Sequence, residues 1–207
     1  MPFRPLPDYP RRAHLEFYRA HPAPFYATTF ELDGAPLRAR LAAAGLPVYA
    51  GFCWAFHRAL LTLPAFRVRL VDGQPVEYEG LRLGLTVPAP RRTFSFATLE
   101  WDADPAAFFP RAAAAMEEAS RAVDLSGGRE PDFAYYTALP GVPFTGFTHV
   151  PPVDPTAGQP QIAFGRFTAD GAALRVPVGV QVNHLFIDGV DLGDLHAAAA
   201  ESFAAAL

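Results

Sequence analysis

The chain has 207 residues, of which 51% are hydrophobic and 13% aromatic, and its formal net charge at pH 7 is −4. A chain of this length and composition can bury one sizeable core, so we expect a single domain spanning residues 1–207. The acidic charge, the lack of a basic run longer than a pair and the lack of a long apolar segment exclude nucleic-acid and membrane partners. We therefore expect a soluble, cytoplasmic protein.

Helical spacing and strand-like alternation follow one another through the first half of the chain. Prolines end the first helical segment, and Gly45 ends the second. A third segment, "PVYAGFCWAFHRALLTLP", is apolar enough to be a central core helix. In chain order, the pattern predicts a helix at 11–21, a strand at 25–34, helices at 35–45 and 47–64, and strands at 66–73, 76–87 and 92–101.

The second half begins with a helix and is then rich in strands. Asp104 and Pro105 are typical of a helix N-terminus. The pattern predicts a helix at 104–123, a loop at 124–132, strands at 133–140 and 143–150, a proline-rich link at 151–160, two strands within 161–184 and a final helix at 190–206. Because these elements lack a regular β-α-β-α order, we expect an α+β fold in which helices pack on a mixed β-sheet.

Missing residue types limit the possible chemistry. All 17 basic residues are arginine, which excludes a P-loop lysine, a Schiff-base lysine and a lysine general base. No serine lies in a G-x-S-x-G elbow, which argues against an α/β-hydrolase. The single cysteine, Cys53, lies in an apolar stretch and is interpreted as an inert buried thiol in a reducing compartment.

The stretch "VQVNHLFIDG" places two ionisable residues where a buried strand ends. His184 follows a strongly apolar run, and Asp188 with Gly189 lies at the turn into the last helix. A histidine among apolar residues is more often a hydrogen-bonded core residue than a catalyst, and Asp188 has an alternative interpretation as a helix cap only. The remaining histidines are scattered, and the nearby acidic residues Asp191 and Asp194 are explained as first-turn helix charges, so we expect no metal.

Six segments together resemble the chloramphenicol acetyltransferase family of CoA-dependent acyltransferases, in the same order and at similar spacing. The spacing from His184 to Gly189 resembles the H-x-x-x-D-G signature of these enzymes. The matching segments are "RRAHLEFYRAH", "PAFRVRLVDGQPVEYEG", "TFSF", "LPGVPFTGF", "FGRF" and "VPVGVQVNHLFIDGVDLGDL". The resemblance covers nearly the whole chain, and it implies an acetyl-CoA-dependent O-acetyltransferase that transfers the acetyl group directly to a hydroxyl acceptor.

The resemblance also implies roles for particular residues. His184 is expected to be the general base, because an imidazole with an ordinary pKa of ~6.5 can accept a hydroxyl proton at neutral pH. Asp188 is expected to pair with Arg11, since a buried carboxylate needs a partner. The family's acceptor pocket is matched by aromatic residues that could equally be core: Phe17, Tyr18, Phe25 and Tyr26. A homotrimer is implied, with His184 from one subunit and the aromatic pocket mostly from the other.

The match breaks where the family stabilises the oxyanion of acyl transfer. The family's donor serine is replaced by Gly146, and its assisting threonine by Ala163. Losing one such donor commonly costs on the order of 10²–10³ in rate. Two interpretations stay open. Another donor, such as Thr145, Thr148 or a backbone N–H at Gly146, supports a different acceptor, or the chain is a catalytically impaired binding or interaction protein on the same scaffold.

The same comparison finds two further departures. Asn183 replaces the first histidine of the family's H-H pair, and Gly141 replaces its tryptophan, which we expect to widen the acceptor pocket or loosen the CoA tunnel. We expect an aromatic or apolar acceptor, with little activity on chloramphenicol.

Overall fold

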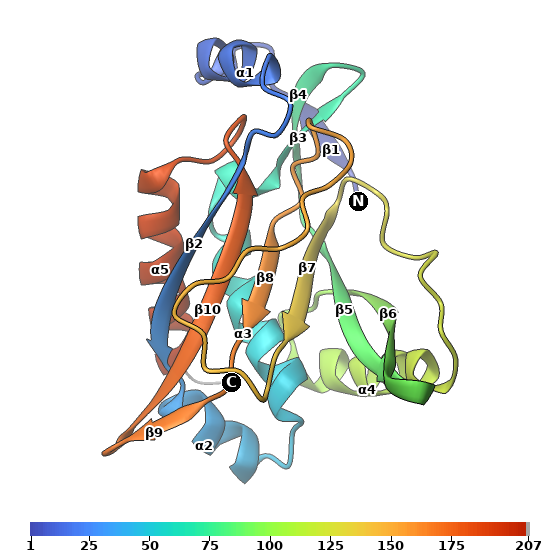
Figure 1. Ribbon diagram of the computed structural model, residues 1–207, viewed down its shortest axis with the longest axis vertical. Coiled ribbons are helices and arrows are strands. Elements are labelled where there is room, and N and C mark those ends of the chain that lie inside the picture. Colours follow the sequence, from blue (N-terminus) through green and yellow to red (C-terminus); the bar gives the residue numbers. More distant parts are fainter. Residues whose placement is uncertain (206–207) are drawn as a thin grey trace.

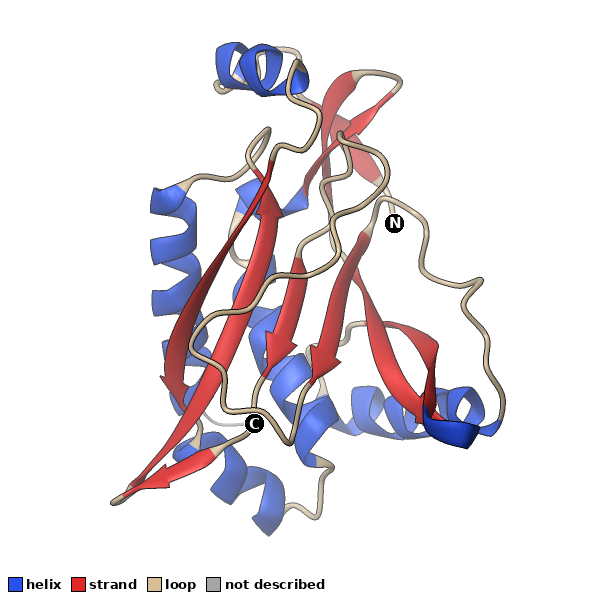
Figure 2. Cartoon of the chain, in the orientation of Figure 1, coloured by secondary structure: helices blue, strands red, loops and turns tan. Residues whose placement is uncertain are grey.

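The computed structural model describes residues 1–205, and within that range the strands form two sheets (Figures 1 and 2). The main sheet has the order β2-β10-β8-β7-β5-β6, with β9 paired to the start of β10. Its strands are β2 (Phe25–Asp33), β5 (Arg82–Ala89), β6 (Thr93–Glu100), β7 (Phe133–Ala138), β8 (Gln161–Phe164), β9 (Thr168–Asp170) and β10 (Ala173–Asn183). A small sheet has the order β1 (Phe3–Pro5), β4 (Gln74–Tyr78) and β3 (Val68–Val71).

The main sheet is mixed. Strand β7 runs parallel to both β5 and β8, whereas β10 is antiparallel to β2 and β8, and β5 is antiparallel to β6. The described helices are α1 (Arg12–Arg19), α2 (Ala35–Ala43), α3 (Val48–Leu61), α4 (Pro105–Arg121) and α5 (Gly189–Ala204), with 3₁₀ turns at Pro64–Arg67 and Pro90–Arg92. The expected α+β fold, with helices packed on a mixed sheet, is confirmed.

Helices α2, α3 and α5 cover one face of the main sheet, and α4 packs beside β5 and β6 (Figure 1). Helix α3 lies at the centre of the core, because its apolar residues surround the helix rather than forming one stripe. The indole of Trp54 is buried there, and its N–H donates to the Asp102 carbonyl at 2.8 Å. The expectation of a central core helix is therefore confirmed.

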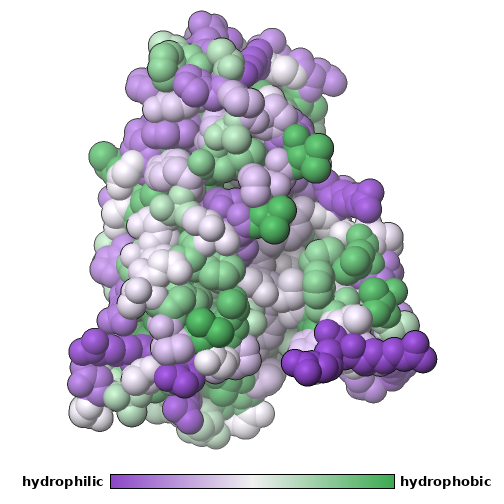
Figure 3. Space-filling model, in the orientation of Figure 1, coloured by the Kyte–Doolittle hydropathy of each residue, from purple (hydrophilic) through white to green (hydrophobic). Residues whose placement is uncertain are grey.

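The opposite face of the main sheet, which we call the loop face, is crossed by the segment 139–160 (Figures 1 and 2). The prediction of a strand at 143–150 is wrong. Prolines flank this stretch, and the N–H groups of Phe147 and His149 donate to side chains of the sheet, Thr29 Oγ1 and Gln181 Oε1, rather than to a strand backbone. Figure 3 shows that this face is hollowed beside the crossing segment.

The stretch 76–87, expected as one strand, contributes to two strands in different sheets, β4 and β5, because the chain turns at Glu79 and Gly80. Strand β1 has no counterpart among the predictions. The final helix ends at Ala204, and the expected end at Ala206 lies outside the described residues. Across residues 1–205, no helix has the length and apolar character needed to cross a membrane.

Candidate active site

His184 lies directly after β10, where the strand ends and a tight turn leads into α5. Strand β10 pairs with β2 as far as Asn183 and Phe25, and the His184 N–H continues the contact by donating to the Pro24 carbonyl at 2.8 Å. The ring of Tyr18 stacks on the imidazole with a centroid distance of 4.2 Å, and the Tyr26 ring lies 4.6 Å away. The imidazole is thus clamped by two aromatic rings from α1 and β2.

The tautomer of His184 follows from its hydrogen bond. Nδ1 lies 3.0 Å from the carbonyl oxygen of Ile187, and a carbonyl can only accept, so Nδ1 carries the proton and donates. In the neutral ring, Nε2 then holds the lone pair, and no group within residues 1–205 bonds to it. The Tyr26 hydroxyl donates to the same Ile187 carbonyl at 3.3 Å, which ties the stacked ring to the same anchor. A half-buried imidazole with an oriented, unoccupied lone pair can accept a proton.

Asn183, one of the departures from the family pattern, shapes the turn that carries His184. Its Oδ1 accepts from the Leu185 N–H at 2.9 Å, and its Nδ2 donates to the carbonyls of Pro155 and Ala157 at 2.8 and 2.9 Å. The side chain is buried with all of these bonds made. Asn183 therefore fixes the turn to the crossing segment, a role that the sequence alone did not indicate.

Asp188 combines the two roles that the sequence left open. Its carboxylate caps α5 by accepting from the Val190 N–H at 3.0 Å, and Asp191 returns the contact by accepting from the Asp188 N–H at 2.8 Å. The other carboxylate oxygen of Asp188 pairs with Arg11. The hydrogen bond from Arg11 lowers the pKa of Asp188, so the carboxylate is charged. The expected pair is present, although Asp188 is one-third exposed rather than mostly buried.

The expected oxyanion region lies apart from His184 of the same chain. The N–H of Phe147, the residue after Gly146, donates to the Thr29 hydroxyl. The Phe147 side chain packs over Gly179, which is the cross-strand partner of Thr29. Gly179 precedes His184 by five residues of extended strand, which is about 17 Å. Thr145 and Gly146 are exposed on the crossing segment, and Ala163 is fully buried opposite Gly179. The chain therefore does not bring these residues to its own histidine.

The aromatic residues fall into different places. Sequence reasoning expected them mostly in the pocket of the other subunit, but Tyr18 and Tyr26 contact His184 of their own chain. Phe17 is 62% exposed on α1 and stacks edge-on against Tyr18, while Phe25 is half-buried at the end of β2. The expectation is thus corrected for Tyr18 and Tyr26, because α1 and β2 both reach the end of β10.

A cavity of about 810 Å³, which we call the large cavity, opens on the loop face. Its floor is formed by alternate residues of neighbouring strands, among them Thr86, Tyr135, Thr137 and Gln161, and its roof by the crossing segment from His149 to Gln159. His184 is not among the described residues that line it. A molecule bound here would not contact His184 of the same chain.

A second cavity of about 440 Å³, the small cavity, lies between α3 and the ends of β7 and β8. It is lined mainly by apolar and aromatic residues, including Phe52 and Phe167, with the exposed Arg38 and Arg166 at its edge. No acid or carbonyl within residues 1–205 engages either guanidinium. Sequence reasoning missed both arginines. The available signal was Arg166 directly after Gly165 in an otherwise apolar stretch.

Comparisons with known proteins identify the family. The chloramphenicol acetyltransferase family model matches residues 5–198. The chain belongs to the chloramphenicol acetyltransferase family. It is 32% identical to a chloramphenicol acetyltransferase of Streptomyces acrimycini over 192 residues, which cover 89% of this chain and 86% of the relative. Membership of this family supports acyl-CoA-dependent acetyltransferase activity for this chain.

Solved structures agree with the fold. A chloramphenicol acetyltransferase structure superposes with a TM-score of 0.86 at 20% identity, covering 95% of this chain and 96% of that one. A dihydrolipoamide acetyltransferase of Azotobacter vinelandii gives a TM-score of 0.63 at 16% identity, covering 93% and 86%. The chloramphenicol acetyltransferase fold is thus shown across nearly the whole chain.

Proposed function

We propose that this chain is an acetyl-CoA-dependent O-acetyltransferase that acts on a hydroxyl of a small aromatic or apolar acceptor, with His184 as general base. The observation that carries the proposal is the His184 imidazole, whose Nδ1–H is committed to the Ile187 carbonyl and whose Nε2 is left with a lone pair. The H-x-x-x-D-G resemblance and family membership support the same role.

The reaction balances without a covalent enzyme intermediate. Nε2 of His184 takes the hydroxyl proton as the acceptor oxygen bonds to the acetyl carbonyl carbon, giving a tetrahedral oxyanion. The C–S bond then breaks, and the CoA thiolate receives the proton from His184. The ring stack with Tyr18 and Tyr26 holds the imidazole plane, and the Arg11–Asp188 pair fixes the turn beneath it.

The two cavities suit the two substrates. The small cavity offers an apolar wall and two exposed arginines, which match the pantetheine chain and the phosphates of CoA. The large cavity suits the acceptor. We expect Arg38→Ala combined with Arg166→Ala to raise the acetyl-CoA KM at least tenfold while kcat and the acceptor KM change little. An unchanged acetyl-CoA KM would place CoA elsewhere.

A homotrimer with sites between subunits is part of the proposal. It is supported by the separation of His184 from Gly146 and by the absence of His184 from the described lining of the large cavity. In this arrangement, one chain supplies His184 with Tyr18 and Tyr26, and its neighbour supplies the large cavity. Light scattering coupled to size-exclusion chromatography tests it, and a monomer that turns over acetyl-CoA would contradict it.

The second candidate is a catalytically impaired binding or interaction protein on the same fold. Gly146 and Ala163 favour it, because neither offers a hydroxyl where the family places its donor and the donor's assistant. Free-thiol release from acetyl-CoA, measured against a panel of hydroxylated acceptors, separates the two. We expect turnover that requires an acceptor and is lost in His184→Ala. No release with any acceptor would favour the second candidate.

A further inference from the structure

The floor of the large cavity is polar at one end. Gln161 on β8 pairs across the sheet with Gln181 on β10, and the amide of Gln181 donates to Gln161 Oε1 at 2.8 Å. Gln161 also lies beside Tyr135 of β7 in the register of the sheet, so it faces the same side and lines the cavity. The Thr86 and Thr137 hydroxyls lie 2.8 Å apart on the neighbouring strands. These amides and hydroxyls are neutral hydrogen-bonding groups.

His149 stands over this polar end of the cavity. Its backbone N–H donates to Gln181 Oε1 at 3.1 Å, which holds the residue above the paired glutamines, and its ring packs edge-on against Phe147 at 4.8 Å. His149 is among the residues that line the large cavity. Within residues 1–205, neither ring nitrogen has a hydrogen-bond partner, and Nε2 is shielded from solvent.

The ring of His149 lacks the hydrogen-bond partners that a buried imidazole normally has. Burial lowers the pKa of His149 to about 4, so the ring is neutral at physiological pH and offers one N–H donor and one lone pair. Buried polar atoms in native proteins are nearly always bonded, so an unpartnered ring beside a cavity indicates a partner that the chain itself does not provide. The χ2 torsion of histidine is broad, so a modest ring rotation turns Nε2 toward the cavity that His149 lines.

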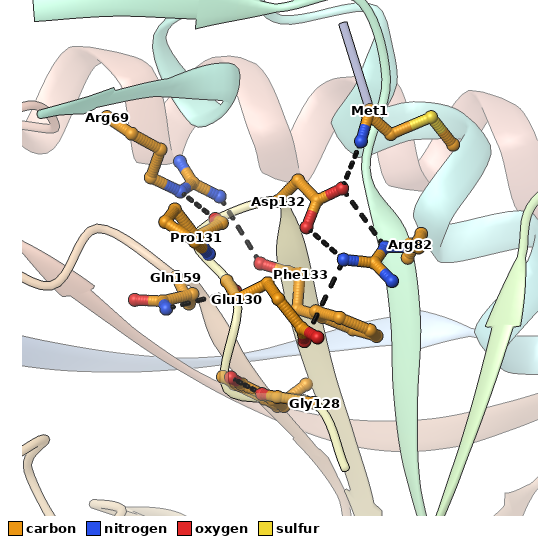
Figure 4. Close-up of polar contacts among 10 residues, drawn as sticks. Met1, Arg69, Arg82, Gly128, Glu130, Pro131, Asp132, Phe133 and Gln159 are labelled. Atoms are coloured by element: carbon orange, nitrogen blue, oxygen red, sulfur yellow. Dashed lines mark hydrogen bonds and ion pairs between the residues drawn. The ribbon is translucent and has the colours of Figure 1, made fainter. Parts of the chain in front are cut away.

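Three charged residues line the cavity, namely Arg69, Arg129 and Asp154. Arg69 is fully buried, and its guanidinium donates to the carbonyls of Pro131 and Phe133 (Figure 4). It also donates to the carbonyls of Phe66 and Val68. At the edge, the exposed carboxylate of Asp154 accepts from the hydroxyl and N–H of Thr156. The N–H donors of Arg69 are therefore engaged within the chain, and Arg129 and Asp154 are exposed to solvent, which screens their charges.

We propose that His149 is a specificity-determining residue of the acceptor site, which hydrogen-bonds an uncharged polar group, such as an amide, in the non-reacting part of the acceptor. This inference rests on the proposed function, and it narrows the substrate class to neutral alcohols that carry such a group between the reacting hydroxyl and an apolar end. Gln161 lies at the same end of the cavity, where its Oε1 accepts from Gln181 and its Nε2 donates to the Val150 carbonyl at 3.4 Å.

Two acceptors that differ only in an amide test the proposed hydrogen bond between His149 and the acceptor. N-(2-hydroxyethyl)benzamide and 4-phenylbutan-1-ol have chains of equal length, and they differ where the first carries an amide. The variants are His149→Leu, which keeps an apolar volume but no nitrogen, and His149→Asn, which keeps a donor and an acceptor. His196→Leu, an exposed histidine on α5 at the opposite face, is the matched control.

We expect His149→Leu to lower kcat/KM for the amide about tenfold, the loss given by one hydrogen bond of about 1.4 kcal/mol. The hydrocarbon alcohol should change less than twofold, the acetyl-CoA KM should stay constant, and His149→Asn should recover part of the loss. Equal losses for both alcohols, or a raised acetyl-CoA KM, would overturn the proposal, as would a wild-type protein that does not prefer the amide.

A separate measurement applies if the protein is not an acetyltransferase. If the wild-type protein releases no thiol with any acceptor, binding of the same two alcohols is measured by calorimetry, which needs no turnover. Weaker amide binding in His149→Leu, with hydrocarbon binding unchanged, then supports the role of His149 without the enzyme activity. Amide binding that is the same in wild type and His149→Leu, with both proteins folded, overturns it.

Discussion

Placing a hydroxyl at residue 146 tests whether the missing oxyanion donor limits this enzyme. Gly146 is exposed on the crossing segment, and a Cβ built there has no other atom within 4 Å. Its φ lies outside the left-handed region, so serine fits the backbone without strain. Gly146→Ser is therefore expected to fold like the wild type. Gly146→Ala, which adds the Cβ without the hydroxyl, is the matched control.

The expected gain in kcat follows from the transition-state stabilisation that one oxyanion hydrogen-bond donor provides. A correctly aimed oxyanion donor contributes roughly 3 kcal/mol, or on the order of 10²–10³ in kcat, and imperfect aim gives less. Adding Ala163→Thr should increase the gain by orienting the new hydroxyl. Because Ala163 is fully buried in β8, two extra heavy atoms there also cost about 1–3 kcal/mol of folding stability, so the double variant needs a thermal-unfolding control.

The assay follows free-thiol release with acetyl-CoA and chloramphenicol at saturating concentrations. We expect weak or no activity in the wild type and in Gly146→Ala, a measurable gain in Gly146→Ser, and a larger gain in the double variant. Wild-type turnover near ~10²–10³ s⁻¹ would mean that another group already supplies the donor. A double variant that folds, binds both substrates and shows no gain would mean that the hydroxyl was never the limiting group.

Three further predictions concern His184, the Arg11–Asp188 pair and the fully buried His57. His184→Ala should reduce acetyl transfer to below a few per cent of the wild-type rate with fold and oligomer intact, and a faster variant would remove the general-base role. Asp188→Ala should lower both kcat and the melting temperature, the lost cap alone costing about 1 kcal/mol, whereas Arg11→Met should lower kcat with a smaller melting shift because the cap remains. Burial lowers the pKa of His57 to about 4, below its unfolded value, so its contribution to stability is present above pH ~6.5 and is lost as pH falls towards 4. His57 alone predicts a loss of about 2 kcal/mol in the free energy of unfolding from pH 7 to 5, measured by urea titration in a His149→Leu background, because burial also lowers the pKa of His149 to about 4. An exposed-site control, His14→Gln, should show the same loss, and a flat profile in the wild type would contradict the assignment.

The local patterns of this sequence determine most of its elements but little of their pairing. The alternation in β2 and β10 and the spacing of α3 are local properties, and they predicted those elements correctly. The segment 143–150 also alternates, yet its N–H groups bond to side chains of β2 and β10, and no property of the segment itself reveals distant partners. Where periodicity alone is ambiguous, pairing with distant segments therefore decides whether a stretch forms a strand.

The same limit applies to the site. The contacts of Asp188 were open to prediction because a cap is local and its arginine partner lies in a recognised segment. The stacking of Tyr18 on His184 and the hydrogen bonds of Asn183 join segments that are far apart in the sequence. The unpartnered state of His149 depends on three elements meeting at one cavity, so only coordinates could reveal it.

The amide of Asn183 has a consequence for how acceptor preference can change in this protein. It bonds to the Pro155 and Ala157 carbonyls in the segment that roofs the large cavity, and it sits immediately before His184. Insertions or exchanges that reshape residues 150–160 for a new acceptor would therefore also move the turn that carries His184. Variation on the floor of the cavity at Thr86 or Thr137, whose hydroxyls bond to each other, carries no such coupling, so adaptation to new acceptors should accumulate on these strands before it reaches the roof.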